Sequence, residues 1–163
     1  MNVRRRIAAA TVLLATPVLS SCGLSFDAQT DQVYQPAVGV DNRDGTVDVL
    51  NALVVSGTEG SGTVVATLVA NDQSSGDTLK DVTGAGRDSG ITATVAGDTA
   101  IPAGGLLNLA TKGDITVRGK RIVPGYFVSI TFSFDRAEAI TVNVPVVSAS
   151  NPDYADVRLP SGS

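Results

Sequence analysis

The stretch that decides the fold is YFVSITFSFDRAEAITVNVPVV, residues Tyr126–Val147. It contains two runs in which apolar and polar residues alternate, Tyr126–Phe134 and Ala139–Val147. Successive side chains of a β-strand point to opposite faces, so this alternation predicts two strands that are each buried on one face. The short polar connection DRAE predicts that they pair as a hairpin. The face of the first strand that we expect in the core carries Val128, Ile130, Phe132 and Phe134.

Similar patterns recur upstream, where Gly- and Pro-containing loops separate short apolar runs. No segment has the 3.6-residue period of an amphipathic helix. Short strands at this spacing predict an all-β fold, an antiparallel, immunoglobulin-like β-sandwich that occupies residues 34–147. The glycine-rich GTEGSG (57–62) lacks the Lys-Ser/Thr of a phosphate-binding loop, so we interpret it as a hairpin connection. The additional strands are predicted at Thr46–Ser56, Gly62–Ala70, Thr78–Thr83, Ile91–Ala96, Leu106–Leu109 and Asp114–Arg118.

The N-terminus has the layout of a secretory signal peptide. Arg4–Arg6 form a positive region, Ile7–Val18 is apolar, and small residues lead to Cys22. Leu19–Cys22 (LSSC) also resembles a bacterial lipobox, which implies that cleavage follows residue 21 and that the Cys22 thiol carries a diacylglyceryl group. The alternatives are an ordinary secreted protein with one stray thiol and an uncleaved membrane anchor. The three arginines leave the general and the twin-arginine export routes open.

Under this interpretation, residues 1–21 are a signal peptide, residues 22–33 a lipidated tether, and the Ser- and Pro-rich residues 148–163 a flexible tail. Loss of Arg4–Arg6 without any acid changes the formal net charge from −4 to −7. An acidic mature chain argues against nucleic acid as a partner. The predicted location is the outer face of the plasma membrane, with attachment by the lipid alone.

The composition excludes several kinds of chemistry. The chain has no His, its only Met is Met1, and its only Cys is Cys22. A Ser-His-Asp triad therefore cannot form, and neither can a tetrahedral zinc site of Cys and His ligands. Cu(I) prefers thiolate and thioether ligands, which the mature chain would lack. We predict no cofactor, no bound metal and no enzymatic activity. Paired carboxylates are the lowest-ranked alternative, because no spacing singles out a pair.

Three motifs resemble the periplasmic copper chaperone (PCu(A)C) domain family. They are Ile101–Gly105 (IPAGG), Ile130–Phe134 (ITFSF) and Val144–Val146 (VPV), and they match in order and spacing. The chain is similar in this respect to actinobacterial lipoproteins related to the family. The resemblance implies a cupredoxin-like β-sandwich, in agreement with the strand pattern.

The resemblance also locates a departure from the family in GDITVRG (113–119). If Gly119 matches the family glycine, Asp114 stands where the family has a His ligand and Thr116 where it has a Met ligand. Arg118 takes the next outward position, while Ile115 and Val117 keep the inward, apolar ones. We therefore expect the strand to survive without its copper ligands.

Several other candidate sites have a simpler interpretation. Asp41–Gly45 (DNRDG), with Asp48 nearby, suggests a calcium loop, but Arg43 occupies a ligand position and no Glu closes the loop; a solvated turn is expected. Lys120 and Arg121, with Arg118, form a basic cluster that we expect to be a solvated turn, with an acidic partner as the alternative. Tyr126 and Phe127 open a core strand and are expected to be packing residues.

The predicted function is that of a membrane-anchored, non-catalytic binding or accessory module of the cell envelope. Its partner would be an envelope protein, and no small-molecule substrate is identified. The expected partner surface consists of Asp114, Thr116 and Arg118. The alternative is a metal-trafficking lipoprotein that uses non-standard or partner-supplied ligands.

Overall fold

The computed structural model describes residues 38–112 and 115–160, all within the unit Gln35–Ser163. Strands β9 (Phe127–Phe134) and β10 (Ile140–Ser148) form the predicted hairpin, with Val144 opposite Val128. Val128, Ile130 and Phe132 are fully buried, as the alternation predicts. Phe134, at the end of β9, is half-buried and packs against the core.

The other predicted strands are present, with two short additions at β1 and β6. Strands β2 and β3 are joined by a turn at Glu59–Gly60, where Gly60 has φ +85° and thus adopts the left-handed conformation that favours glycine. The helical pieces are short: η1 (Gly86–Asp88), α2 (Leu109–Lys112) and η2 (Pro152–Tyr154). The remaining strands are β1 (Val40–Asn42), β2 (Val47–Thr58), β3 (Ser61–Ala70), β4 (Asp77–Gly84), β5 (Thr92–Val95), β6 (Ala100–Ile101), β7 (Leu106–Asn108) and β8 (Ile115–Arg118).

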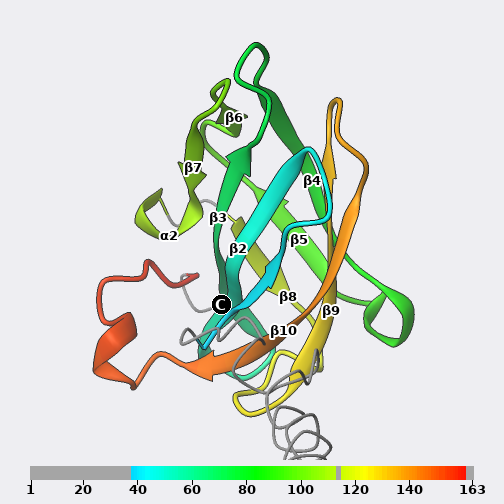
Figure 1. Cartoon of the computed structure of the whole chain (residues 1–163). Coiled ribbons are helices and arrows are strands. Elements are labelled where there is room, and N and C mark those ends of the chain that lie inside the picture. The colour runs from blue at the N-terminus through cyan, green and yellow to red at the C-terminus, as the bar shows by residue number, and fades with distance from the viewer. Residues whose placement is uncertain (1–37, 113–114, 161–163) are drawn as a thin grey trace, which may run out of the picture. The chain divides into compact units, whose positions relative to one another are not determined.

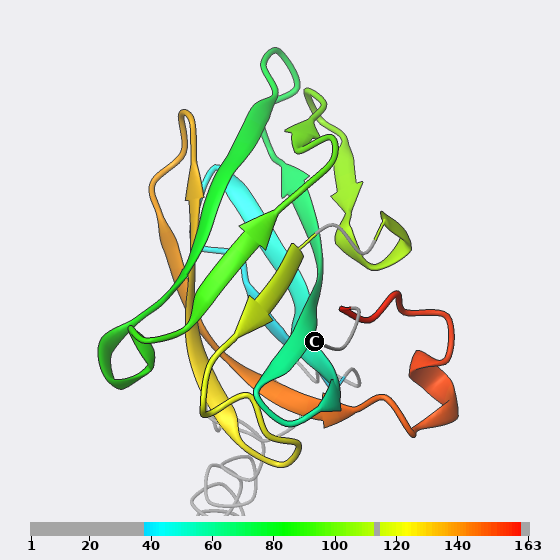
Figure 2. The ribbon, with the colours of Figure 1, turned by 180° about the vertical axis from the view of Figure 1, so that it is seen from behind.

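The strands form one curled sheet in the order β5-β8-β3-β2-β10-β9-β4-β6, with β1 on β2 and β7 on β3 (Figures 1 and 2). Its two halves face each other like the layers of a sandwich, which confirms the predicted fold class. One pairing differs from the antiparallel expectation, because β10 runs parallel to β2 with Val146 opposite Val54. Parallel neighbours need a long connection, here β3 to β9. A local sequence pattern carries no information about such a distant pairing.

The core lies between the two halves. Val49, Leu68, Ile115, Ile130 and Phe132 are among its fully buried members. They come from β2, β3, β8 and β9, so the inward residues of both halves interdigitate as in other sandwiches. The alternation in the sequence therefore predicts this part of the core directly.

The C-terminal segment, where the composition predicts a flexible tail, makes specific contacts with the sheet. Residues 149–157 pack on the outer face of the sheet, where Leu53, Val55 and Val65 are buried beneath Tyr154 and Val157. The buried Thr63 Oγ1 also donates a hydrogen bond of 2.6 Å to the Arg158 carbonyl oxygen. Strands β2 and β3 are apolar on both faces, so the outer face also requires a cover. Figure 2 shows this orange-to-red segment beside β2 and β3.

The predicted signal peptide, the tether with Cys22, and Asp114 lie outside the described residues. Within the part of the chain that the structure describes, no helix has the length and apolar character needed to cross a bilayer.

Candidate functional site

Strand β8 carries the predicted partner surface and lies between β3 and β5. Ile115 and Val117 are fully buried, Thr116 is half-buried and Arg118 is exposed. The inward and outward positions are thus those that the sequence predicts. The structure places Thr116 and Arg118 on one face of the strand.

Hydroxyl-bearing residues flank this outward face. Thr116 pairs with Thr63 on β3 and Thr94 on β5, and Arg118 pairs with Ser61 and Thr92. Neutral hydroxyl oxygens and a guanidinium are poor ligands for Cu(I), which favours soft sulfur donors. Thr63 is buried and already donates its hydroxyl to the Arg158 carbonyl oxygen. The accessible residues of this face, Thr92, Thr94, Thr116 and Arg118, are therefore suited to hydrogen bonding rather than to soft-metal binding.

A buried carboxylate that the sequence analysis did not single out lies at the β4–β5 connection. The Asp88 side chain is fully buried. Its Oδ1 accepts a hydrogen bond of 2.6 Å from Arg121 Nε, and its Oδ2 accepts one of 3.0 Å from the Ser129 backbone N–H. Arg87 Nε lies 3.8 Å from the same Oδ2. The ion pair links the β4–β5 connection to the β8–β9 loop and to β9.

The local sequence explains how Asp88 reaches this position. In GAGRDSG (84–90), Gly86 has φ +56°, and a side chain at Gly84 would collide with the Asp88 carbonyl oxygen. These glycines permit the tight turn that places η1 against β9. An Asp between glycines has the sequence signature of an exposed turn. The signal that could have found it is Arg121, whose guanidinium needs an acidic partner once its loop packs against the sheet.

The aromatic residues Tyr126 and Phe127 lie at the start of β9 as predicted, but they are 53% and 49% exposed, so the expectation that they are packing residues is wrong. Phe127 falls on the outward face of β9, opposite the core face of Val128. The Arg121 Cζ lies 5.6 Å from the centroid of the Tyr126 ring, within cation–π range. Arg121 Nη2 also donates to the Phe127 carbonyl oxygen at 3.2 Å.

We call Arg87, Lys120, Arg121, Tyr126 and Phe127 the basic-aromatic end. An open hollow of about 350 Å³ lies among its cations, with Ile91 on its wall. The predicted solvated turn at Lys120 and Arg121 is thus a structured surface, in which Lys120 is exposed and Arg121 is half-buried. Figure 1 shows the β8–β9 loop at the lower end of the view, away from the β3–β4 and β9–β10 turns.

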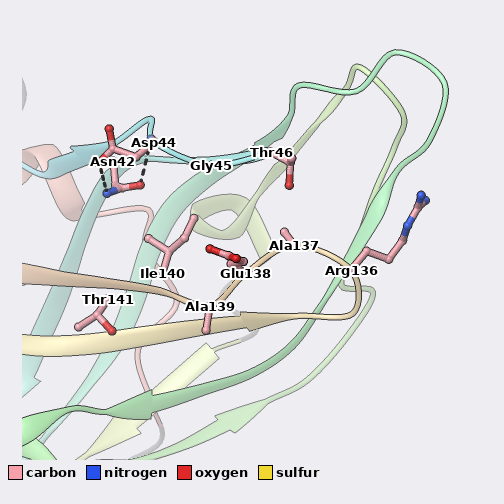
Figure 3. A pocket seen from close by; sticks show the side chains of 10 residues that line it. All are labelled: Asn42, Asp44, Gly45, Thr46, Arg136, Ala137, Glu138, Ala139, Ile140 and Thr141. Atoms are coloured by element: carbon pink, nitrogen blue, oxygen red, sulfur yellow. Dashed lines mark hydrogen bonds between the residues drawn. The ribbon is translucent and has the colours of Figure 1, made fainter.

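The opposite end of the sheet is acidic. An open hollow of about 700 Å³ there is lined by Asn42, Asp44, Arg136 and Glu138 among others, as Figure 3 shows. Asn71 ties the turns of this end together, since its N–H donates to the Thr46 carbonyl oxygen and its Nδ2 to Asp48 Oδ1. The acidic end is defined by Asp44, Asp48, Asp72, Asp77, Asp135 and Glu138.

The calcium-loop alternative falls on this end. Asp41 Oδ1 accepts a hydrogen bond of 2.7 Å from the Asn51 N–H, and its Oδ2 accepts one from Arg43. Asp44 Oδ2 accepts one from Asn42 Nδ2 at 3.2 Å. Within residues 38–112 and 115–160, no three His, Cys, Asp or Glu side chains come together as a metal site would require. These carboxylates instead bind the chain itself, as in a solvated turn.

Two carboxylates of the acidic end have lowered pKa values. Hydrogen bonds from the Ser74 and Ser75 hydroxyls hold the pKa of Asp72 well below its usual range. Burial acts to raise the pKa of Asp77, but backbone N–H donors of Thr78, Ala137 and Arg136 outweigh it and lower the pKa. Asp77 thereby fastens the β9–β10 turn to β4.

Comparison with known proteins supports the fold but supplies no sequence relative. No family model and no curated protein matches the chain. Among solved structures, the apo PCuAC domain from PmoF1 has a TM-score of 0.54 at 15% identity. The copper-bound PCuAC domain from PmoF2 has a TM-score of 0.53 at 17% identity, and the apo PmoF2 domain has 0.51 at 15%.

The extent of these matches is also informative. Each covers 67% of this chain and between 95% and 99% of the matched domain, so nearly the whole PCuAC fold has a counterpart here. The structure is therefore similar to PCuAC copper-chaperone domains in fold. This confirms the PCuAC-type fold that the motifs IPAGG, ITFSF and VPV predict.

Proposed function

We propose that this chain is a non-catalytic binding module of the cell envelope, with a copper-chaperone-like fold that does not itself hold Cu(I). The observation that carries the proposal is the contrast within β8. Ile115 and Val117 keep the strand in the core, while the outward Thr116 and Arg118 offer no soft ligand. The sequence adds that residues 23–163 contain no His, Met or Cys.

The site of action that we propose is the outer face of the plasma membrane. The Arg-rich start, the apolar run and LSSC at 19–22 support export and lipidation of Cys22. Each acyl CH₂ group that is buried in the bilayer contributes about 0.8 kcal/mol to membrane binding. Two or more acyl chains, as on a lipidated Cys22, are therefore enough for stable attachment. Asp114, Thr116 and Arg118 remain the proposed surface for an envelope protein partner.

One experiment separates this function from copper trafficking, which the likeness to the copper-bound PmoF2 domain favours as the alternative. The intact chain, purified in detergent, is titrated with Cu(I) against a competing chelator and with Cu(II) by calorimetry. The proposed function predicts no submicromolar site. Submicromolar binding by the monomer would establish the alternative.

A second experiment addresses the anchor and the partner. Crosslinking in native membranes followed by mass spectrometry should recover an envelope protein joined to this chain. In parallel, Cys22→Ala should abolish the mass added by the lipid and release the protein from the membrane fraction. A variant that keeps the lipid mass would show that another residue carries the anchor.

A further inference from the structure

We propose that the basic-aromatic end is a docking surface for the anionic headgroups of a phospholipid bilayer. The proposal does not rest on lipidation of Cys22 or on the fate of copper. It arises from three cations and two exposed aromatic rings that meet on one end of an otherwise acidic chain.

The residue types suit the boundary between headgroups and acyl chains. Tyr126 presents an apolar ring with a polar hydroxyl, Phe127 adds an apolar ring beside it, and both are about half exposed. Aromatic rings of this kind favour the headgroup level, and neighbouring Lys and Arg side chains attract anionic lipids. Arg87, Lys120 and Arg121 surround the hollow next to these rings and supply that charge.

The surface is preformed. The buried Asp88 holds Arg121, and Arg121 in turn holds the Phe127 carbonyl and lies over Tyr126. In the β8–β9 loop, the backbone N–H groups of Gly119, Ile122, Val123, Gly125 and Tyr126 all donate to carbonyl oxygens within the fold. Binding therefore requires little ordering of this loop, which lowers its entropic cost.

The charge distribution favours attraction despite the negative total. Within this end Asp88 offsets one of three cations, which leaves a net of two positive charges. Glu59 in the β2–β3 turn and Arg118 at the end of β8 add one charge of each sign, so the local net charge stays at two. Strand β2, 12 residues long, runs from the acidic end to the turn beside the β8–β9 loop. At roughly 3.3 Å per residue the two ends are up to about 40 Å apart. Because the Debye length is about 8 Å, the distant acids are screened from a membrane that touches the basic-aromatic end.

An acidic peptide is the competing partner, and the structure favours it less. Peptides commonly bind by adding a strand to an exposed sheet edge. The basic-aromatic end is built largely from connections, and the loop N–H groups named above are already engaged. Half-exposed rings are also better covered by acyl chains than by an acidic peptide.

The test uses a single tryptophan as a local reporter, since the chain has no Trp. Phe127→Trp places it in the basic-aromatic end, and Ala139→Trp places it on an exposed position of the acidic end as a matched control. The intact chain is reconstituted with vesicles of phosphatidylcholine alone or with about one-third phosphatidylglycerol. On the anionic vesicles, Trp fluorescence of the Phe127→Trp protein should shift to the blue and be quenched by brominated lipid. That of the Ala139→Trp protein should not change.

A charge variant makes the expectation quantitative. Each basic residue at an anionic surface is worth about fivefold in binding, so a net of two charges gives about 25-fold preference for anionic vesicles. Lys120→Glu in the Phe127→Trp chain takes the net charge of this end to zero and should remove that preference. Salt at about 0.5 M should reduce the blue shift and the quenching of the Phe127→Trp protein that retains Lys120, because salt screens its attraction to the anionic vesicles.

Three results would overturn the inference. They are an unchanged spectrum of the Phe127→Trp protein on anionic vesicles, an equal response of the Ala139→Trp protein, and insensitivity to Lys120→Glu. Saturable binding of a poly-glutamate peptide with no vesicle response would assign the surface to a protein partner instead. Flotation of the chain with neutral vesicles reports the lipid anchor separately, so failure of the anchor and failure of this surface are distinguishable.

Discussion

The two ends of the sheet use charge in different ways. At the basic-aromatic end, one carboxylate, Asp88, is fully buried and holds a half-exposed Arg121 at 2.6 Å. At the acidic end, the carboxylates are mostly exposed and bind turn backbones and hydroxyls, as Asp72 and Asp77 do. The first arrangement fixes an exposed surface of cations and aromatic rings, and the second fastens turns. The contrast shows that burial of a carboxylate, rather than the number of carboxylates, decides whether it holds a cationic side chain or the backbone of a turn.

The largest effect is expected from Arg121→Met. It leaves the buried Asp88 carboxylate with the Ser129 N–H and the more distant Arg87 Nε, 3.8 Å from Oδ2, as partners, and breaking a buried ion pair by removing one member costs roughly 3 to 5 kcal/mol of unfolding free energy. Urea denaturation of the variant and of the unmodified chain measures this loss.

The control for that prediction is the double variant Asp88→Asn with Arg121→Met, which removes both charges. It should recover much of the lost stability, because no unpaired charge remains. A single Arg121→Met variant as stable as the unmodified chain would show that the pair is not a structural element of this end.

An intermediate effect is expected from Asp77→Ala at the acidic end. The variant loses three backbone hydrogen bonds to a carboxylate, and we expect a loss of roughly 1 to 3 kcal/mol in unfolding free energy. Asp77→Asn, which keeps the shape and one acceptor oxygen, should lose less.

The effect of Asp77 should also depend on pH in a defined direction. Its pKa is lower in the folded than in the unfolded chain, so ionised Asp77 stabilises the fold above the unfolded value of about 3.9. That contribution disappears as the pH falls through the lower, folded pKa. The stability difference between the unmodified chain and Asp77→Ala should therefore be constant from neutral pH to about 5 and shrink below about 4. A difference that grows on acidification would contradict the assignment.

The smallest effect is expected from the exposed ion pair of Lys80 and Asp135, whose side chains are 59% and 54% exposed. Lys80→Ala should change the unfolding free energy by no more than about 1 kcal/mol, because solvent screens such pairs. Thermal denaturation at low and high salt provides the measurement. A loss as large as that of Arg121→Met would erase the contrast between the two ends.

The strands and the core between them could be predicted from the sequence because alternation depends only on neighbouring residues. Val128, Ile130 and Phe132 of β9 and Ile115 and Val117 of β8 are buried as predicted. The parallel pairing of β2 with β10 and the packing of residues 149–157 were not predictable in the same way. Both depend on surfaces that are brought together only by the complete fold, although the apolar runs of β2 and β3 indicate two buried faces.

The candidate site was predicted only in part. The outward positions Thr116 and Arg118 follow from alternation, and Lys120 and Arg121 were recognised as a basic cluster. Asp88 was missed because its burial arises from a tertiary contact with a loop 33 residues away. The exposure of Tyr126 and Phe127 was not predicted. Large aromatic residues are mostly buried in folded proteins, and the sequence alone does not show that those at the start of this strand face the solvent.

The central claim is that β8 retains the strand of a copper-chaperone-like fold and has lost its ligands. It is tested most directly by restoring the residues that the resemblance implies, Asp114→His with Thr116→Met, and measuring Cu(I) affinity by chelator competition. A control pair, Thr141→His with Asn143→Met, gives the same spacing on the exposed face of β10. The account predicts no submicromolar Cu(I) site in the unmodified chain and at least about tenfold tighter binding in the β8 variant than in the control. Tight binding by the unmodified chain, or equal binding by the two variants, would contradict it.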